Sequence, residues 1–370
     1  MTARKLFGGA AVAVAVVVAA VAVCAAGSAW TQQAVKGDVP SARFSCALVA
    51  VPGRDALLLY GGRAAGWTVF YNDTFVYDVP TATWRALELP SGPSPRFSPR
   101  VVPVAERTDA VYLFGGSYYE QFTDKEYLHD YTDLWLFDFG AMKWTAQPAG
   151  VGLPRARQAP AVGAVRGRML LFGGRDACMK NGEACPADVW TWRDMRNDTW
   201  VADLTQSPAV WTQVPTAVAP PVRVDAATWV RGARVYVFGG RVFAPDVDFY
   251  TLNDMWAFDM DTLRWSPVRQ TGDVPAGRHS ATAIPLDDSR VLVSHGGHSE
   301  TVWFDDSYVF TLTTPTEGVW TRARTPASPS PREGMSYARS TSGRPVAFGG
   351  KIYNKKLKET AYNDTWVFTL

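Results

Sequence analysis

Cysteine and histidine are scarce in this 370-residue chain, with four of each. So few cysteines exclude a disulfide-dense scaffold, and so few histidines leave little material for metal sites. No low-complexity tract or block of like charge interrupts the sequence. The excess of 37 basic over 35 acidic residues is due to Arg4 and Lys5, so the rest of the chain is neutral. A neutral chain has no electrostatic footprint for nucleic acid, and we exclude that class of partner.

The N-terminus has the layout of a signal peptide. Arg4 and Lys5 precede an unbroken apolar run from residue 6 to about 26, and Gly27-Ser28-Ala29 then offers small residues to signal peptidase. The run also matches the roughly 20 residues that span a bilayer, so an uncleaved signal anchor is the alternative. Both interpretations place residues 30–370 outside the cytosol, either secreted or anchored to a membrane.

The cysteines divide into three groups. Cys24 lies in the leader, Cys46 lies in a strand-like run, and Cys178 and Cys185 flank six residues of one loop. In an oxidising compartment we expect Cys178 and Cys185 to form a local disulfide. Two unpaired loop thiols are the alternative if the chain is not exported.

The composition is typical of many short strands joined by tight turns, with 31 Gly, 25 Pro and 15 Trp. A short apolar strand ending in a glycine pair occurs six times, at Gly61-Gly62, Gly115-Gly116, Gly173-Gly174, Gly239-Gly240, Gly296-Gly297 and Gly349-Gly350. A variable loop and an Asn-Asp-like signature follow each pair, at residues 72–78, 132–138, 197–200, 253–259, 305–310 and 363–368. The residues of that signature alternate in the period of two expected for a strand.

Two further marks complete each unit. A lone Trp opens a third segment, at Trp84, Trp144, Trp211, Trp265 and Trp320. A Pro-x-x-Arg turn leads into a fourth, with its arginine at Arg43, Arg96, Arg157, Arg223, Arg278 and Arg332. Each unit therefore predicts four strands, the content of one propeller blade.

These marks resemble the Kelch family, whose repeat combines Gly-Gly, Asn-Asp-x-Trp and a spaced Trp in about 50 residues. The resemblance implies an all-β fold of the galactose oxidase/Kelch type, a six-bladed β-propeller with four-stranded blades over residues 30–370. The sixth unit ends before its Trp strand, while Trp30-Thr31-Gln32 matches Trp211-Thr212-Gln213. We therefore predict that the N-terminal strand closes the last blade. Many relatives carry a His three residues after the turn arginine, whereas this chain has Cys46, Pro99, Pro160, Ala226, Ala281 and Met335 there.

Residues that recur in every unit are expected to be scaffold. Glycine pairs permit unusual backbone conformations, and each Trp is expected to bury area between blades. We expect the turn arginines to pair with the Asn-Asp aspartates between blades. Three Asn-x-Thr sequons, at Asn72, Asn197 and Asn363, coincide with the same signature.

Function is expected where insertions break the repeat, because such insertions gather on one face of a repeat fold. All long insertions lie between the Gly-Gly and Asn-Asp strands, at residues 63–71, 117–131, 175–196, 241–252, 298–304 and 351–362. Four basic residues follow glycine pairs, namely Arg63, Arg175, Arg241 and Lys351. The resemblance implies a ligand-binding role for them, because Kelch relatives that bind acidic peptides carry ligand-contacting arginines there. The aromatic candidates are Tyr118, Tyr119, Trp190, Trp192, Phe243 and Trp303, and we expect a protein or carbohydrate ligand.

A catalytic role is the alternative. Kelch relatives include sugar-acid epimerases and a copper-dependent oxidase, so an enzyme acting on a sugar is conceivable, but no catalytic residue is identifiable. His279 and His298 should reach the insertion-bearing face and are candidates for a metal site, for which no third ligand is evident. His295 is expected to take the place of the usual Phe before Gly-Gly, as a strand residue. We expect no cofactor and favour binding over catalysis.

Overall fold

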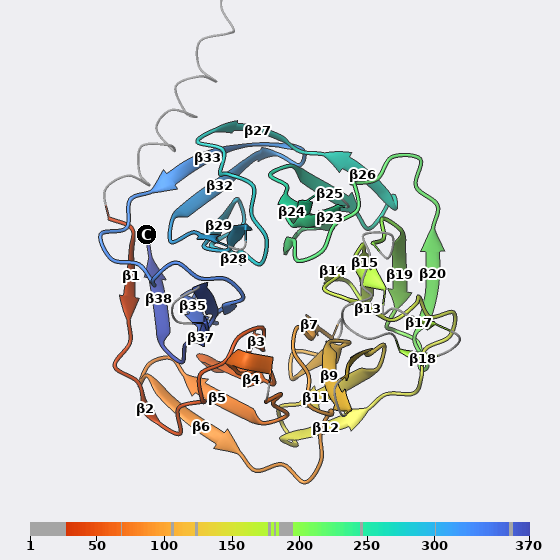
Figure 1. Cartoon of the computed structure of the whole chain (residues 1–370), viewed down its shortest axis with the longest axis horizontal. Coiled ribbons are helices and arrows are strands. Elements are labelled where there is room, and N and C mark those ends of the chain that lie inside the picture. The colour runs from red at the N-terminus through yellow and green to blue at the C-terminus, as the bar shows by residue number, and fades with distance from the viewer. Residues whose placement is uncertain are drawn as a thin grey trace, which may run out of the picture.

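The computed structural model describes residues 27–370 except 68, 105–106, 123–124, 177–178, 181–182, 185–194, 245–246, 300 and 355–357. Six blades of antiparallel strands surround a central axis, and the first strand of each blade lies nearest to that axis (Figure 1). This arrangement confirms the six-bladed, all-β prediction. No helix among the described residues is long and apolar enough to cross a membrane.

The strands of each blade follow one another from the axis outward. Blade 1 contains β3 (Ala47–Ala50), β4 (Ala56–Tyr60), β5 (Thr74–Asp78) and β6 (Thr83–Leu87), with β2 (Lys36–Gly37) parallel to β6. Blade 2 contains β7 (Arg100–Pro103), β8 (Ala110–Phe114), β11 (Leu134–Asp138) and β12 (Lys143–Ala146). Blade 3 contains β14 (Ala161–Val165), β15 (Arg168–Phe172), β19 (Thr199–Asp203) and β20 (Val210–Val214).

The remaining blades repeat this order. Blade 4 contains β21 (Ala227–Arg231), β22 (Arg234–Phe238), β25 (Met255–Asp259) and β26 (Arg264–Pro267). Blade 5 contains β28 (Thr282–Pro285), β29 (Arg290–Ser294), β32 (Ser307–Thr314) and β33 (Glu317–Ala323), with β27 (Arg269–Gly272) parallel to β33. Blade 6 contains β34 (Ser336–Arg339), β35 (Pro345–Phe348), β38 (Thr365–Thr369) and β1 (Ala29–Gln32).

The N-terminal strand closes the ring, as the sequence predicted. Strand β1 pairs antiparallel with β38, so that Trp30 lies opposite Phe368 (Figure 1). The side chain of Trp30 is 1% exposed, and its Nε1 donates a hydrogen bond of 3.0 Å to the hydroxyl of Ser307 in blade 5. Blade 6 is therefore assembled from both ends of the chain.

The tryptophan of the outer strand joins each blade to the one before it. Trp84 donates from Nε1 to the hydroxyl of Thr365 at 3.1 Å, and Trp144 and Trp265 do the same to Thr74 and Thr199. Burying one aromatic side chain of this size removes about 150–250 Å² from water, which is favourable by about 4–6 kcal/mol. The prediction that these residues bury area between blades is confirmed.

The turn arginines form buried ion pairs, but within a blade. Arg96 is fully buried, and its Nη1 and Nη2 lie 2.6 and 2.9 Å from the two carboxylate oxygens of Asp133 in the same blade. The other pairs are Arg43–Asp73, Arg157–Asp198, Arg223–Asp254, Arg278–Asp306 and Arg332–Asp364. The connection to the preceding blade is made by main chain, since Arg96 N donates to Tyr71 O and Gly62 N donates to Arg96 O. The expectation that these ion pairs cross between blades was therefore wrong.

In blade 5 the glycine turn begins one residue earlier than the Gly296-Gly297 pair predicts. His295 has a φ of 60°, in the region favoured by glycine, and its N–H donates to Asp306 O as that of Gly239 does to Asp254 O. His295 thus takes the place of the first glycine, and Ser294 takes the place of the expected Phe. The imidazole is 1% exposed, and burial lowers its pKa to about 4. His295 is therefore a neutral scaffold residue.

Candidate functional site

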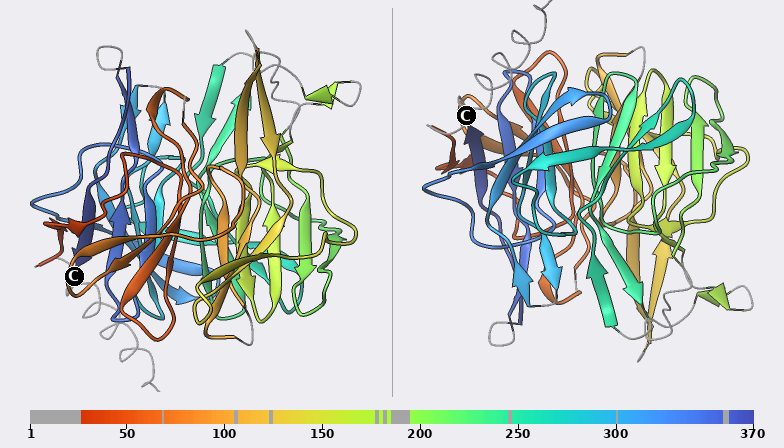
Figure 2. Two further views of the ribbon diagram at one scale, coloured as in Figure 1. Left: turned by 90° about the horizontal axis from the view of Figure 1, so that it is seen from below. Right: turned by 90° about the horizontal axis from the view of Figure 1, so that it is seen from above.

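The hairpins that follow the glycine turns rise from one face of the ring, which we call the hairpin face (Figure 2). Five blades carry a two-stranded hairpin there: β9 (Ser117–Phe122) with β10 (Lys125–Asp130), β17 (Met179–Lys180) with β18 (Glu183–Ala184), β23 (Arg241–Ala244) with β24 (Val247–Thr251), β30 (Gly297–Ser299) with β31 (Val302–Trp303), and β36 (Lys351–Asn354) with β37 (Lys358–Ala361). Blade 1 has a 3-10 turn instead, η2 (Ala65–Trp67), and β13 (Arg157–Gln158) pairs with β16 (Arg175–Asp176) below the blade 3 hairpin.

The base of this face, which we call the floor, consists of two residues from each blade. The residue after the turn arginine pairs with the residue after the glycine turn, giving Phe44 with Arg63, Phe97 with Ser117, Gln158 with Arg175, Val224 with Arg241, His279 with Gly297 and Glu333 with Lys351. The four basic residues expected to contact a ligand therefore lie on one floor. They are brought together from blades 1, 3, 4 and 6.

Two of these basic residues share a carboxylate. Arg63 is 2% exposed, and its Nη2 lies 3.3 Å from Glu359 Oε1, while Lys351 Nζ lies 2.6 Å from the same oxygen. Lys351 Nζ also lies 3.4 Å from Glu333 Oε1. Burial lowers the pKa of Arg63 to about 10. Burial alone would raise the pKa of Glu359, but the positive charges of Lys351 and Arg63 outweigh it and hold that pKa below its usual value. This side of the floor is a neutralised network between blades 1 and 6.

The other two basic residues hold an aromatic ring between them. The guanidinium carbons of Arg175 and Arg241 lie 4.6 and 5.1 Å from the centroid of the Phe243 ring. Arg241 also lies 2.9 Å from Asp225 Oδ2, and Arg175 donates to Gln158 Oε1 at 2.9 Å. The side chain of Arg241 remains 27% exposed. It is therefore more exposed than Arg63 and Lys351, which are 2% and 17% exposed.

Three of the aromatic candidates, Tyr118, Tyr119 and Phe243, pack against other aromatic rings of this face. Tyr119 stacks on Phe97 at 5.8 Å, and Tyr118 meets Phe70 edge-on at 5.1 Å. Trp303 is half-buried in its hairpin. Trp190 and Trp192 lie outside the described residues, as do Cys178 and Cys185, so their roles and the disulfide stay predictions. Cys46 is a free cysteine.

The histidine candidates for a metal site have protein partners. His279 is 2% exposed, and its Nδ1 lies 3.1 Å from Glu333 Oε2, while burial lowers its pKa well below the ordinary value. His298 Nδ1 lies 2.7 Å from the hydroxyl of Thr251 and 2.8 Å from the carbonyl of Gly277. Within the described part of the chain, no group of three or more His, Cys, Asp or Glu residues could hold a metal ion.

Sequence reasoning missed the acids of this face. Glu333 directly follows a turn arginine, and Asp225 comes two residues after one. Blade 2 carries Phe97 and Ser98 at these two positions, so an acid there could have indicated a site residue. Asp130 was not among the predicted site residues either. Its Oδ1 accepts a 2.5 Å hydrogen bond from Ser117, its Oδ2 is buried without a partner in the described structure, and burial raises its pKa to about 7.

Comparisons with known proteins agree with this architecture. The model of the KLHDC2/KLHL20/DRC7 Kelch-repeats domain matches residues 5–200 and 191–370. Kelch domain-containing protein 2 of Bos taurus is 22% identical over 322 residues, which cover 83% of this chain and 75% of that protein. Kelch domain-containing protein 1 of Homo sapiens is 22% identical over 321 residues, covering 80% and 72%.

A plant relative is similar over a smaller part of its length. Acyl-CoA-binding domain-containing protein 5 of Arabidopsis thaliana is 25% identical over 286 residues, covering 74% of this chain but 39% of that protein. The family match spans both halves of the ring. The chain belongs to the Kelch-repeat β-propeller family.

Proposed function

We propose that this chain is an exported protein-binding module that contacts its partner with the hairpin face. A Kelch propeller is typically a binding scaffold, and its variable loops are free of the packing that dictates the blades. The observation that carries the proposal is the set of exposed apolar side chains on this face. Val69, Tyr250, Val302 and Tyr353 are 44%, 49%, 42% and 45% exposed.

These four side chains come from four consecutive blades, 4, 5, 6 and 1, so they flank the floor along one side rather than cluster on one loop. Exposed aromatic and aliphatic groups around a polar centre are typical of protein interfaces, where aromatic side chains provide much of the binding energy. Burying a Tyr and a Val side chain on this face would each contribute about 1.5–3 kcal/mol before the cost of association.

The floor would then provide specificity more than affinity. Its cations already have partners, since Arg241 contacts Asp225, and Arg63 and Lys351 contact Glu359. A ligand gains binding free energy from this floor only if its own polar groups complement these ion pairs, because any side chain it displaces must find a new partner. Arg241, which is 27% exposed, is the cation that a partner carboxylate reaches with least rearrangement.

A protein partner is favoured over a glycan. Sugars stack on open ring faces, but the ring of Phe97 in the floor is covered by the stacked ring of Tyr119. A glycan array and capture of a protein partner by the fragment 30–370 separate the two. A concentration-dependent glycan signal that is lost on Tyr250→Ser or Tyr353→Ser would contradict the proposal, because it would place a glycan on the hairpin face.

Export is supported by the way the chain enters the ring. Strand β1 begins at Ala29, and cleavage after Ala29 would remove the end pair of the β1–β38 ladder, Ala29 with Thr369, while the three pairs from Trp30 onward remain. It would also remove the bonds of Ser28 Oγ to Arg324 O and of Thr369 Oγ1 to Ala29 O. Ser28 is 3% exposed in the closed ring, so the peptidase would have to act before blade 6 forms. N-terminal sequencing of the mature protein should begin at Trp30. Recovery of the intact leader in a membrane fraction would favour the signal anchor.

A further inference from the structure

One position of the inner strand breaks the repeat. The residue opposite the end of the second strand is Ala47, Ala161, Ala227, Thr282 or Ser336 in five blades, and Arg100 in blade 2. The five small residues are 1–4% exposed, which shows that blade packing requires a small side chain there. The scaffold therefore does not account for the guanidinium of Arg100.

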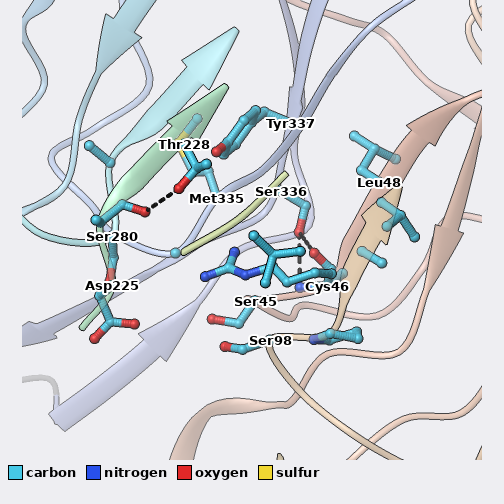
Figure 3. Close-up of a pocket in the computed structure, with 18 residues that line it drawn as sticks. Ser45, Cys46, Leu48, Ser98, Asp225, Thr228, Ser280, Met335, Ser336 and Tyr337 are labelled. Atoms are coloured by element: carbon cyan, nitrogen blue, oxygen red, sulfur yellow. Dashed lines mark hydrogen bonds between the residues drawn. The ribbon is translucent and has the colours of Figure 1, made fainter. Parts of the chain in front are cut away.

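Arg100 lines a cavity on the propeller axis, just inside the floor. The cavity has a volume of about 200 Å³ and is also lined by Ser45, Ser98, Ser280 and Asp225 (Figure 3). All four have a φ of 50–56°. Main-chain bonds join them into a belt, in which Ser98 N donates to Ser45 O at 2.7 Å and Ser280 N donates to Asp225 O at 2.8 Å. This backbone arrangement holds three serine residues around the cavity.

The charge of Arg100 is not balanced locally. Its Nε is buried without a hydrogen-bond partner in the described structure. Asp225 is the one acid among the described lining residues, and it already lies 2.9 Å from Arg241. Arg100 is half-buried, and withdrawing part of a guanidinium from water is costly unless an anion or a set of acceptors accompanies it. The cavity thus combines an uncompensated positive charge with hydroxyl donors.

We propose that this cavity binds a small free oxyanion of the size of sulfate or phosphate, with Arg100 as the charged donor. A guanidinium presents a fork of N–H groups that matches two oxygens of such an ion. The hydroxyls of Ser45 and Ser98, which lie side by side in Figure 3, can donate to the remaining oxygens. A volume of about 200 Å³ is below the roughly 300–1,000 Å³ of drug-sized ligand pockets, which favours an ion over a peptide segment or sugar. The inference does not depend on what binds the hairpin face.

Calorimetric titration of the fragment 30–370 with sodium sulfate, at ionic strength held constant with sodium chloride, tests the proposal. The expected result is saturable binding with one site per chain. Arg100→Ala should weaken binding at least tenfold, and it should fold because Ala47, Ala161 and Ala227 occupy the same place in other blades. Arg100→Lys should bind with intermediate affinity, because it keeps the charge and loses the fork.

The matched control is Arg85→Ala, which removes an equal charge from the exposed face of β6 (Thr83–Leu87) and should leave sulfate binding unchanged. General stabilisation by sulfate rises without saturation and is common to all variants. Equal binding by the wild type and Arg100→Ala, or no saturable binding by the wild type, would overturn the proposal. A short acidic peptide that displaces sulfate from the wild type would instead show that the site takes a partner's carboxylate.

Discussion

Replacing Trp30 with alanine tests whether the N-terminal strand closes the ring in solution. The side chain is 1% exposed and packs against Phe368, with ring centroids 5.2 Å apart. Removing an aromatic side chain from such a site costs about 3–5 kcal/mol in free energy of unfolding. The indole also donates to Ser307, whose hydroxyl keeps Ser294 Oγ as a partner at 2.8 Å, so its loss adds about 1 kcal/mol. We expect a total of about 4–6 kcal/mol.

The assay is urea and thermal unfolding of the fragment 30–370. A loss of this size should lower Tm by roughly 10 °C, since 1 kcal/mol corresponds to about 2 °C in a large domain. Trp30→Phe keeps most of the buried area and should cost about 1–2 kcal/mol. Trp84→Ala is the matched control, because Trp84 is equally buried and donates to Thr365 in the same way. A change below 1 kcal/mol for Trp30→Ala, beside a full effect for Trp84→Ala, would refute closure by β1.

Three further outcomes follow from burial and charge. Arg63→Ala should destabilise the chain by about 3–5 kcal/mol because it breaks a buried pair, whereas Arg241→Ala should cost about 1 kcal/mol and mainly weaken partner binding, which urea unfolding and a binding assay separate. Because burial raises the pKa of Asp130 to about 7, the folded chain keeps a proton that the unfolded chain releases near pH 4. Tm should therefore fall as pH rises from about 4 to 7 and level off above that. The Asp130→Asn variant should lack this slope. Burial raises the pKa of the Cys46 thiol to about 11, so a thiol reagent at pH 8 should label Cys46 much more slowly in the folded chain than after unfolding.

The fold was predictable because its determinants recur. Six copies of each mark fix the number of blades and the four-strand order, and a Trp at residue 30 that matches Trp211 indicates which strand is missing from the last unit. These residues act locally, through turns, alternation and burial between neighbouring blades. Because each mark occurs in several units, one unit with an altered mark does not change the predicted fold.

Blade 5 is where that pattern misled. Gly296 and Gly297 match the glycine pair by residue type, but main-chain hydrogen bonds assign the first turn position to His295. A histidine with a φ of 60° is uncommon, and no sequence pattern marks it. The turn conformation is set by the neighbouring blades, which hold the backbone there.

The charge balance of the floor could not be read from the sequence for a similar reason. Arg63 and Glu359 are 296 residues apart and meet only because the ring closes. The basic residues were therefore identified without the acids that neutralise them. Arg100, too, becomes informative only once the strand register shows which residues share its position.

Site-specific photo-crosslinking tests the central claim, that the hairpin face binds a protein partner, most directly. A photoreactive residue would replace Tyr250 or Tyr353 on the hairpin face, or Asp261 in the turn between β25 and β26 on the opposite face. The modified fragments would be exposed to the extracellular fraction of the source organism, with unmodified fragment as competitor. The account predicts a crosslinked protein of discrete mass from positions 250 and 353, lost on competition, and none from position 261. A competed adduct from position 261 alone would contradict it.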